Sequence, residues 1–191
     1  METDALLSNV RDLFALLEER RIEYVLVNGV ALLSYVEGRN TEDIDLIMAL
    51  SSLAQLPEIK VESQDVHFAR GKFGQLGVDI LLTRNPLFEK VRQGYAQKQK
   101  YVEREIPTAS LEGLLLLKLY ALPSLYRQGN FVRVGLYEND IATLMQAYEP
   151  DTNALLSVLE AYLGENDIAE LKTVLAEIQQ RIARFRNGTN K

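Results

Sequence analysis

Three aspartates in the first half of the chain have the type and spacing of a metal site. Asp43 and Asp45 lie two residues apart in DIDLIMA, and Asp79 interrupts the apolar run GVDILLT. Both runs predict β-strands, and because side chains alternate across a sheet, Asp43 and Asp45 project from one face. A carboxylate among apolar residues is costly to bury unless it is paired, and a metal shared by the three aspartates would offset that cost.

Three carboxylates on adjacent strands can hold two divalent cations. One cation would align a triphosphate and the other would activate an attacking hydroxyl, which is what phosphoryl or nucleotidyl transfer needs. The chain has no cysteine, so carboxylates remain as ligands and the expected ion is hard, Mg²⁺ or Mn²⁺. We therefore expect Asp43, Asp45 and Asp79 to converge at one edge of the sheet. The alternatives are a capped strand edge beside Thr41 for the aspartate pair and a solvated carboxylate for Asp79.

A turn and two basic residues are candidates for binding phosphate. Asn28 and Gly29 follow the apolar strand EYVLV and open a short helix, where a glycine lets backbone N–H groups and the helix dipole approach an anion. Lys118, within the apolar helix SLEGLLLLKLYAL, either snorkels from a buried face or reaches a triphosphate. Arg39 either clamps a phosphate or pairs with a neighbouring glutamate.

The elements that must position these residues form a mixed αβ segment followed by an all-helical one. Hydrophobic periodicity predicts strands at 23–27, 43–49, 59–62, 66–70 and 77–83, with an edge strand at 100–106. It predicts helices at 4–20, 30–36, 87–95, 110–122, 140–148, 152–163 and 167–186. Pro123 is expected to end one helix and Asp140 to cap the start of the next. A boundary near Pro107 separates an αβ core, 1–107, from a helical region packed on it, 108–191.

Composition narrows the class of protein. The 191 residues are 47% apolar and 25% charged, as in an ordinary folded domain. No apolar run approaches the length that spans a bilayer and the acidic start is unlike a signal peptide, so we expect a cytoplasmic protein without a membrane partner. The net charge of −6 argues against a protein that coats nucleic acid in general, because such binding depends on neutralising phosphates with basic residues. Residues 84–133 contain nine basic and four acidic side chains. This local excess of positive charge forms either an anion-binding face or solvated surface.

The motif around the aspartate pair resembles that of a known family. The run VNGVALLSYVEGRNTEDIDLIMA is similar to the signature of nucleotidyltransferase-fold proteins of the AbiEii or MenT toxin type, a Gly-rich turn followed by Arg-x-Thr-x-Asp-x-Asp. Arg39, Thr41, Asp43 and Asp45 occupy those positions here. The similarity continues through GVDILLT, which holds the third carboxylate, and through the helix that contains Lys118.

The resemblance implies an α+β nucleotidyltransferase fold, a small mixed sheet flanked by helices with a helical C-terminal part. It also implies transfer of a nucleotide from an NTP to an RNA or protein acceptor, with an antitoxin protein as a further partner. The expected catalytic and metal-binding residues are Asp43, Asp45 and Asp79. The expected nucleotide-binding residues are Asn28, Gly29, Arg39, Thr41 and Lys118. The alternative is a catalytically weakened relative that binds a nucleotide or a protein partner without turnover.

Overall fold

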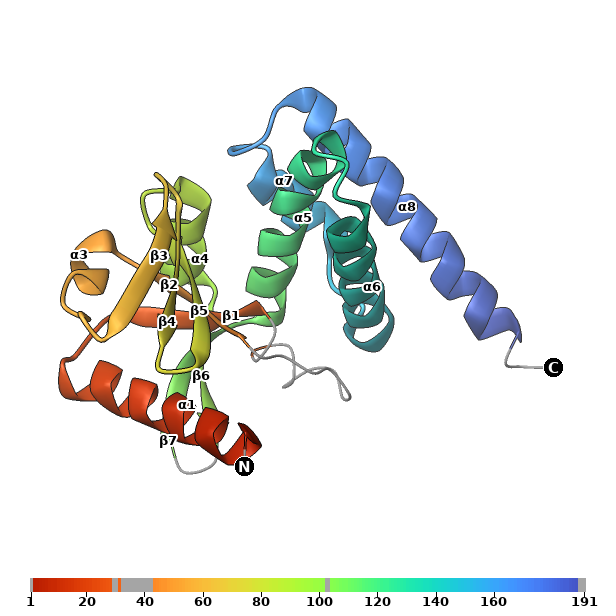
Figure 1. Ribbon diagram of the computed structural model, residues 1–191. Helices are drawn as coiled ribbons and strands as arrows, with labels where there is room; N and C mark the ends of the chain where they lie inside the picture. Colours follow the sequence, from red (N-terminus) through yellow and green to blue (C-terminus); the bar gives the residue numbers. More distant parts are fainter. Residues whose placement is uncertain (1, 29–30, 32–42, 102–103, 189–191) are drawn as a thin grey trace. The chain divides into compact units, whose positions relative to one another are not determined.

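The computed structural model describes residues 2–28, 31, 43–101 and 104–188. The chain divides into two compact units, Met1–Ser110 and Leu111–Lys191. In the described part of the chain, the first unit contains the whole sheet and the second contains helices only (Figure 1). The α+β class predicted from the sequence is therefore confirmed.

A mixed sheet forms the centre of the first unit, and its described strands lie in the order β3-β4-β5-β2-β1-β7-β6. Their bounds are Tyr24–Val27 (β1), Asp43–Met48 (β2), Ile59–Gln64 (β3), Phe68–Phe73 (β4), Leu76–Leu82 (β5), Ala96–Tyr101 (β6) and Arg104–Ala109 (β7). The pairs β2–β5 and β1–β7 are parallel, and the other neighbouring pairs are antiparallel. The two central strands β2 and β5 are therefore flanked on both sides, which suits their apolar sequences.

The prediction of one edge strand at 100–106 was wrong in detail. The segment belongs to a hairpin in which β6 is the edge strand and β7 pairs with β1. Pro107 lies in β7, opposite Lys98, so this proline does not interrupt the chain's extended conformation. Proline fixes φ in a range that a strand accepts but cannot donate to a ladder.

Helix α1 (Glu2–Glu19) covers one face of the sheet (Figure 1). Its residues Leu13 and Leu17 are fully buried, and the ring of Phe14 lies 5.9 Å from that of Tyr24. Tyr24 pairs with Met48 across β1 and β2. Helix α1 therefore packs on the face of the sheet to which the Met48 side chain projects.

Helix α4 (Pro86–Gly94) packs on the opposite face. The Asn85 side chain accepts a hydrogen bond from the Leu87 N–H at 2.9 Å and so caps the helix start. Phe88 then meets the ring of Phe68 edge-on at 5.3 Å between centroids. Phe68 lies opposite Leu81 near the end of β5, so α4 covers that end of the face. The short helix α3 (Leu50–Leu53) connects β2 to β3.

The second unit is a group of helices built on a buried central helix. Its helices are α5 (Leu111–Arg127), α6 (Phe131–Tyr148), α7 (Thr152–Leu159) and α8 (Glu165–Gly188). The leucines of α5 at 114, 115, 116, 117, 119 and 122 are buried, and their apolar surface drives the packing. Among the described helices of the protein, none combines the length and the apolar character needed to cross a membrane.

Two helix boundaries expected in this unit were wrong. Helix α5 continues through Pro123 to Arg127, although an internal proline costs about 3 kcal/mol. Leu122 and Leu125 are buried on either side of it, and each buried leucine contributes about 1.5–3 kcal/mol. Asp140 is not a helix cap, because α6 starts nine residues earlier, where Asn130 accepts a hydrogen bond from Arg133 N–H at 3.3 Å.

Candidate active site

The pairing of β2 with β5 places the three aspartates on one face of the sheet. Asp45 lies directly opposite Asp79, and Asp43 lies opposite Gly77. Residues opposite each other in adjacent strands project to the same side. The shared face expected for the three aspartates is therefore confirmed. The intervening residues Ile44 and Val78 point to the other face and are buried.

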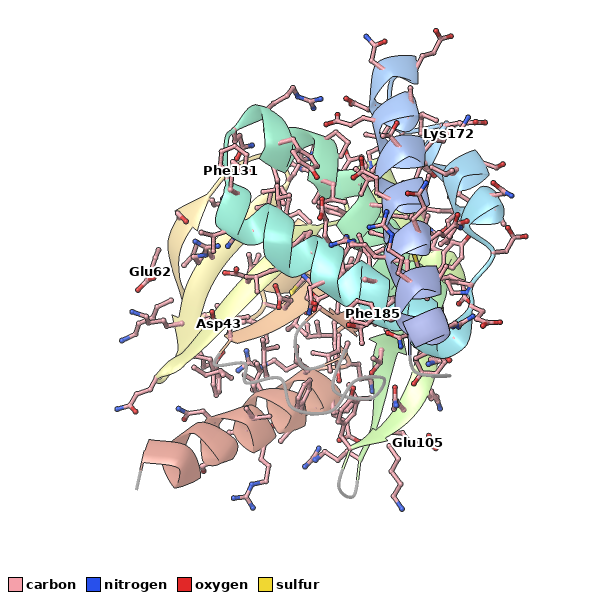
Figure 2. All side chains as sticks on the ribbon, turned by 90° about the vertical axis from the view of Figure 1, so that its right-hand side faces the viewer. Asp43, Glu62, Glu105, Phe131, Lys172 and Phe185 are labelled. Carbon is pink, nitrogen blue, oxygen red and sulfur yellow. The ribbon has the colours of Figure 1, made fainter. Side chains whose placement is uncertain are left out.

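The aspartates occupy the end of this face that α4 does not cover. Asp43 is exposed and begins β2 (Figure 2), and Asp45 and Asp79 are half-buried. Further along the same strands, Ile47 and Leu81 belong to the apolar core. The carboxylates thus lie at the solvent-accessible end of strands whose other end is in the apolar core.

Gly77 leaves the space that the Asp43 carboxylate occupies. A Cβ atom at position 77 would lie 1.9 Å from Asp43 Oδ1 and 2.9 Å from Asp43 Cγ, closer than any non-bonded contact allows. The Asp43 side chain therefore lies over the backbone of β5, the strand that carries Asp79. Only a residue without a Cβ permits that approach.

Asn28, the residue that follows β1, binds the second aspartate, Asp45. Its backbone adopts the left-handed conformation with φ at 54°, which asparagine tolerates better than most residues other than glycine. Its side-chain Nδ2 donates a hydrogen bond to Asp45 Oδ1 at 3.2 Å. The predicted turn residue therefore contacts the predicted carboxylate directly.

Arg70 of β4 holds the third aspartate. Its Nε donates to Asp79 Oδ1 at 2.7 Å, and its Nη2 donates to Asp79 Oδ2 at 2.9 Å. This is a bidentate pair, the strongest arrangement of arginine with a carboxylate. The hydrogen bond to Asp79 raises the pKa of Arg70, and the charges of Asp43 and Asp45 raise it further. The guanidinium therefore lies in the field of all three carboxylates.

The three carboxylates share a face, but their oxygens do not gather into one ligand set. Among the residues that the structure describes, no group of three or more histidine, cysteine, aspartate or glutamate side chains is arranged to hold a metal ion. The expected convergence of the carboxyl groups is therefore not seen. Like charges repel, and two of these carboxylates turn instead to Asn28 and Arg70.

The residues nevertheless fit a hard divalent cation in chemistry and placement. All three side chains offer carboxylate oxygens, the ligands that Mg²⁺ and Mn²⁺ take in proteins. They start from adjacent positions on neighbouring strands, and the absent Cβ of Gly77 leaves the space that Asp43 needs. For Asp79 to present an oxygen to a cation shared with Asp43 and Asp45, its carboxylate would have to turn from the position in which Arg70 holds it.

The remaining predicted site residues are placed differently. Gly29, Arg39 and Thr41 lie outside the described residues. Lys118 belongs to the second unit and is 1% exposed. Its Nζ lies 2.7 Å from Asp140 Oδ2 and 4.4 Å from the centre of the Tyr137 ring. Its contact with a triphosphate stays a prediction, whereas its ion pair is a feature that the sequence did not indicate.

Sequence reasoning missed Arg70 and Gly77, although a signal for both was present. Gly74 has φ at 62° and Phe73 pairs with Leu76, so positions 74 and 75 form a two-residue hairpin turn. That turn fixes the register of β4 against β5 and places Arg70 opposite Asp79. The segment FGQLG carries this turn signal in the sequence.

Comparison with known proteins identifies the fold. By sequence, the chain matches no protein-family profile and no curated protein. In structure it is similar to an antigenic nucleotidyltransferase-like protein from Paracoccidioides brasiliensis, with 19% identity and a TM-score of 0.60 over 96% of this chain and 91% of that one. It is also similar to the antibiotic-resistance factor ANT(2'')-Ia, with 14% identity and a TM-score of 0.57 over 100% and 99% of the two chains.

These similarities define the class of structure. The chain has the nucleotidyltransferase fold, as the sequence motif predicted. At these identities the likeness concerns the fold alone. Membership of the AbiEii or MenT type stays a prediction.

Proposed function

We propose that this protein is a nucleotidyltransferase that depends on a divalent metal and moves a nucleotide from an NTP to an acceptor. The observation that supports the proposal most strongly is the strand register that sets Asp45 opposite Asp79 and Asp43 opposite Gly77. On a nucleotidyltransferase fold, this register brings three carboxylates to one face at the uncovered end of two central strands.

In this proposal each aspartate has a distinct task. Asp43 and Asp45 hold the metal, and Asp79 shares in that and accepts a hydrogen bond from the acceptor hydroxyl. Mg²⁺ or Mn²⁺, when bound, neutralises charge on the triphosphate and makes the acceptor hydroxyl more acidic. Asp79 takes the proton of the acceptor hydroxyl as the acceptor oxygen attacks the α-phosphorus. The bond from that phosphorus to the bridging oxygen breaks, and pyrophosphate leaves.

The nucleotide is proposed to contact the turn after β1 and the segment before β2. The proposed contacts there are Asn28, Gly29, Arg39 and Thr41, and Lys118 of α5 is proposed as a further contact. The fixed backbone of Asn28 and its hydrogen bond to Asp45 support a link between the turn and the carboxylates. For Lys118, which is buried, the ion pair with the partly buried Asp140 means that a phosphate would have to compete with a carboxylate already in place.

The acceptor proposed from the motif is RNA or protein. The AbiEii or MenT resemblance supports that choice, together with a role as the toxin of a toxin–antitoxin pair whose antitoxin binds this chain. ANT(2'')-Ia is described as an antibiotic-resistance factor. A test of acceptors therefore compares a small molecule with RNA and protein. The second candidate function is nucleotide binding without turnover, and the bidentate hold of Arg70 on Asp79 favours it.

A thermal-shift measurement tests nucleotide binding through a metal. At an NTP concentration of about 100 Kd, binding stabilises the folded state by about 2.7 kcal/mol, which raises Tm by roughly 5–10 °C for a chain of this size. We expect that rise with Mg²⁺ and none with EDTA. Asp45→Asn should remove it, whereas Asp12→Asn on α1 should keep it. Equal shifts with and without EDTA would contradict a metal-held triphosphate.

Gly77→Ala tests the placement of Asp43. The added Cβ must displace the Asp43 carboxylate, and because that side chain is exposed and flexible, Tm should change by no more than about 2 °C. Mn²⁺ affinity should fall about tenfold, as when a residue that supports a metal ligand is changed. The matched control is Gly94→Ala, where a Cβ meets nothing within 4 Å. Unchanged Mn²⁺ affinity in Gly77→Ala would show that Asp43 does not bind the metal.

A further inference from the structure

The Arg70 guanidinium binds both carboxylate oxygens of Asp79, a proposed metal ligand. Its Nε and Nη2 each donate to a different oxygen of Asp79, at 2.7 and 2.9 Å. The pair joins β4 to β5 at directly opposite positions, so the strand register itself brings the guanidinium to the carboxylate. The Arg70 side chain is 56% exposed and that of Asp79 is 27% exposed. The guanidinium can therefore leave towards solvent without unpacking the core.

The charge of Arg70 acts on more than its hydrogen-bonded partner. Asp45 lies opposite Asp79 on β2, and Asp43 is two residues away on the same face. Both attract Arg70 in addition to Asp79. Three neighbouring carboxylates repel one another, and a fixed positive charge among them reduces that repulsion. In the metal-free protein, Arg70 thus supplies charge that a divalent cation would otherwise supply.

A metal and the guanidinium cannot both interact fully with Asp79. A bidentate arginine uses the lone pairs of both oxygens that face it. A metal that takes an oxygen of Asp79 must either displace Arg70 or bind beside its positive charge. Either route weakens metal binding, and the weakening grows with the strength of the pair.

We propose that Arg70 is the internal counterion of the three aspartates and competes with the divalent cation for Asp79, so that this arginine sets the metal affinity of the site. The inference rests on the proposed function, because it takes Asp79 as a metal ligand. Arg70 acts through Asp79 and is a positioning residue. In this arrangement a cation that takes an oxygen of Asp79 either releases it from Arg70 or binds against the positive charge of the guanidinium.

Lys72 provides a matched control on the same strand. It lies two residues from Arg70 in β4 and therefore on the same face, and its side chain is 55% exposed, close to that of Arg70. Its Nζ pairs with Glu62 of the edge strand β3 at 3.1 Å. Neutralising Lys72 changes the charge of the face by the same amount without changing the partner of Asp79.

The test is a titration of the metal-free full chain with Mn²⁺, following free Mn²⁺ by electron paramagnetic resonance. Arg70→Gln should bind Mn²⁺ roughly three- to tenfold more tightly than the wild type, the size expected for a partly exposed bidentate pair. Its Tm without metal should be lower than that of the wild type, because the carboxylates lose their counterion. Lys72→Gln should stay within about twofold in Mn²⁺ affinity. Arg70→Lys keeps the charge without the two-point contact and should fall between the wild type and Arg70→Gln.

The outcomes separate this inference from the function on which it rests. Mn²⁺ binding by the wild type that Asp45→Asn removes, with equal or weaker binding in both Arg70→Gln and Arg70→Lys, would overturn the counterion role alone. Equal tightening in Arg70→Gln and Lys72→Gln would also overturn it, since general charge would then explain the effect. No Mn²⁺ binding sensitive to Asp45→Asn in any variant would overturn the metal site, and the inference with it.

Discussion

Asp79→Asn should lower nucleotide transfer by roughly 10²–10⁴-fold while leaving NTP affinity within a few fold. That range is typical for the loss of a group that assists proton movement in the transition state, and an interaction made mainly there affects turnover rather than binding. Asp45→Asn should reduce both, because Asp45 lies between the turn residue Asn28 and Asp79. The measurement is transfer of label from an α-labelled NTP, with NTP binding followed separately.

Both variants should remain folded. Removing one of three neighbouring carboxylates relieves repulsion in the metal-free protein, so the Tm without metal should be equal to or above that of the wild type for Asp45→Asn. For Asp79→Asn the loss of the Arg70 pair offsets part of this gain. Asp12→Asn, a change on the helix that covers the other face, is the control for transfer. Transfer by Asp79→Asn at the wild-type rate would contradict the role assigned to this residue.

Asp140→Ala should lower the free energy of unfolding by about 3–5 kcal/mol. The substitution removes the carboxylate paired at 2.7 Å with the Lys118 ammonium, and a charge buried without its partner is costly on that scale. Lys118 is 1% exposed, so it cannot reach water without disturbing α5. Urea unfolding followed by circular dichroism measures the change.

A double variant distinguishes charge from packing in this pair. Lys118→Met combined with Asp140→Ala replaces the ammonium by an apolar side chain of similar length, and we expect it to recover most of the stability lost in Asp140→Ala. The Tyr137 ring, 4.4 Å from Nζ, can pack against methionine. A loss below about 1 kcal/mol in Asp140→Ala would show that the pair behaves like an exposed ion pair.

The fold was largely predictable because its elements have clear local patterns. The apolar runs that form β1, β2 and β5 are short, rich in β-branched residues and bounded by turns. The amphipathic helices α1, α4 and α8 have regular apolar spacing and were predicted to within a few residues. Local patterns failed where tertiary packing decided the result, at Pro123 inside α5 and at Asp140 inside α6.

The site was predictable only in part. Asp43, Asp45 and Asp79 were found from their types and their positions on strands, and their common face follows from alternation. Arg70 and Gly77 depend on which residue of one strand lies opposite which residue of the next, and such a register is set by non-local pairing. The Lys118–Asp140 pair likewise joins two helices that sequence spacing does not align.

The most direct test of the proposed function is transfer itself. The wild-type chain is incubated with each α-labelled NTP and Mg²⁺ in the presence of total RNA, cell-lysate protein or a panel of antibiotics, and the labelled product is identified. We expect label in one class of acceptor, dependent on Mg²⁺ and lost in Asp45→Asn. NTP binding that requires Mg²⁺, with no label in any acceptor, would contradict the enzyme and identify a protein that binds nucleotide without turnover.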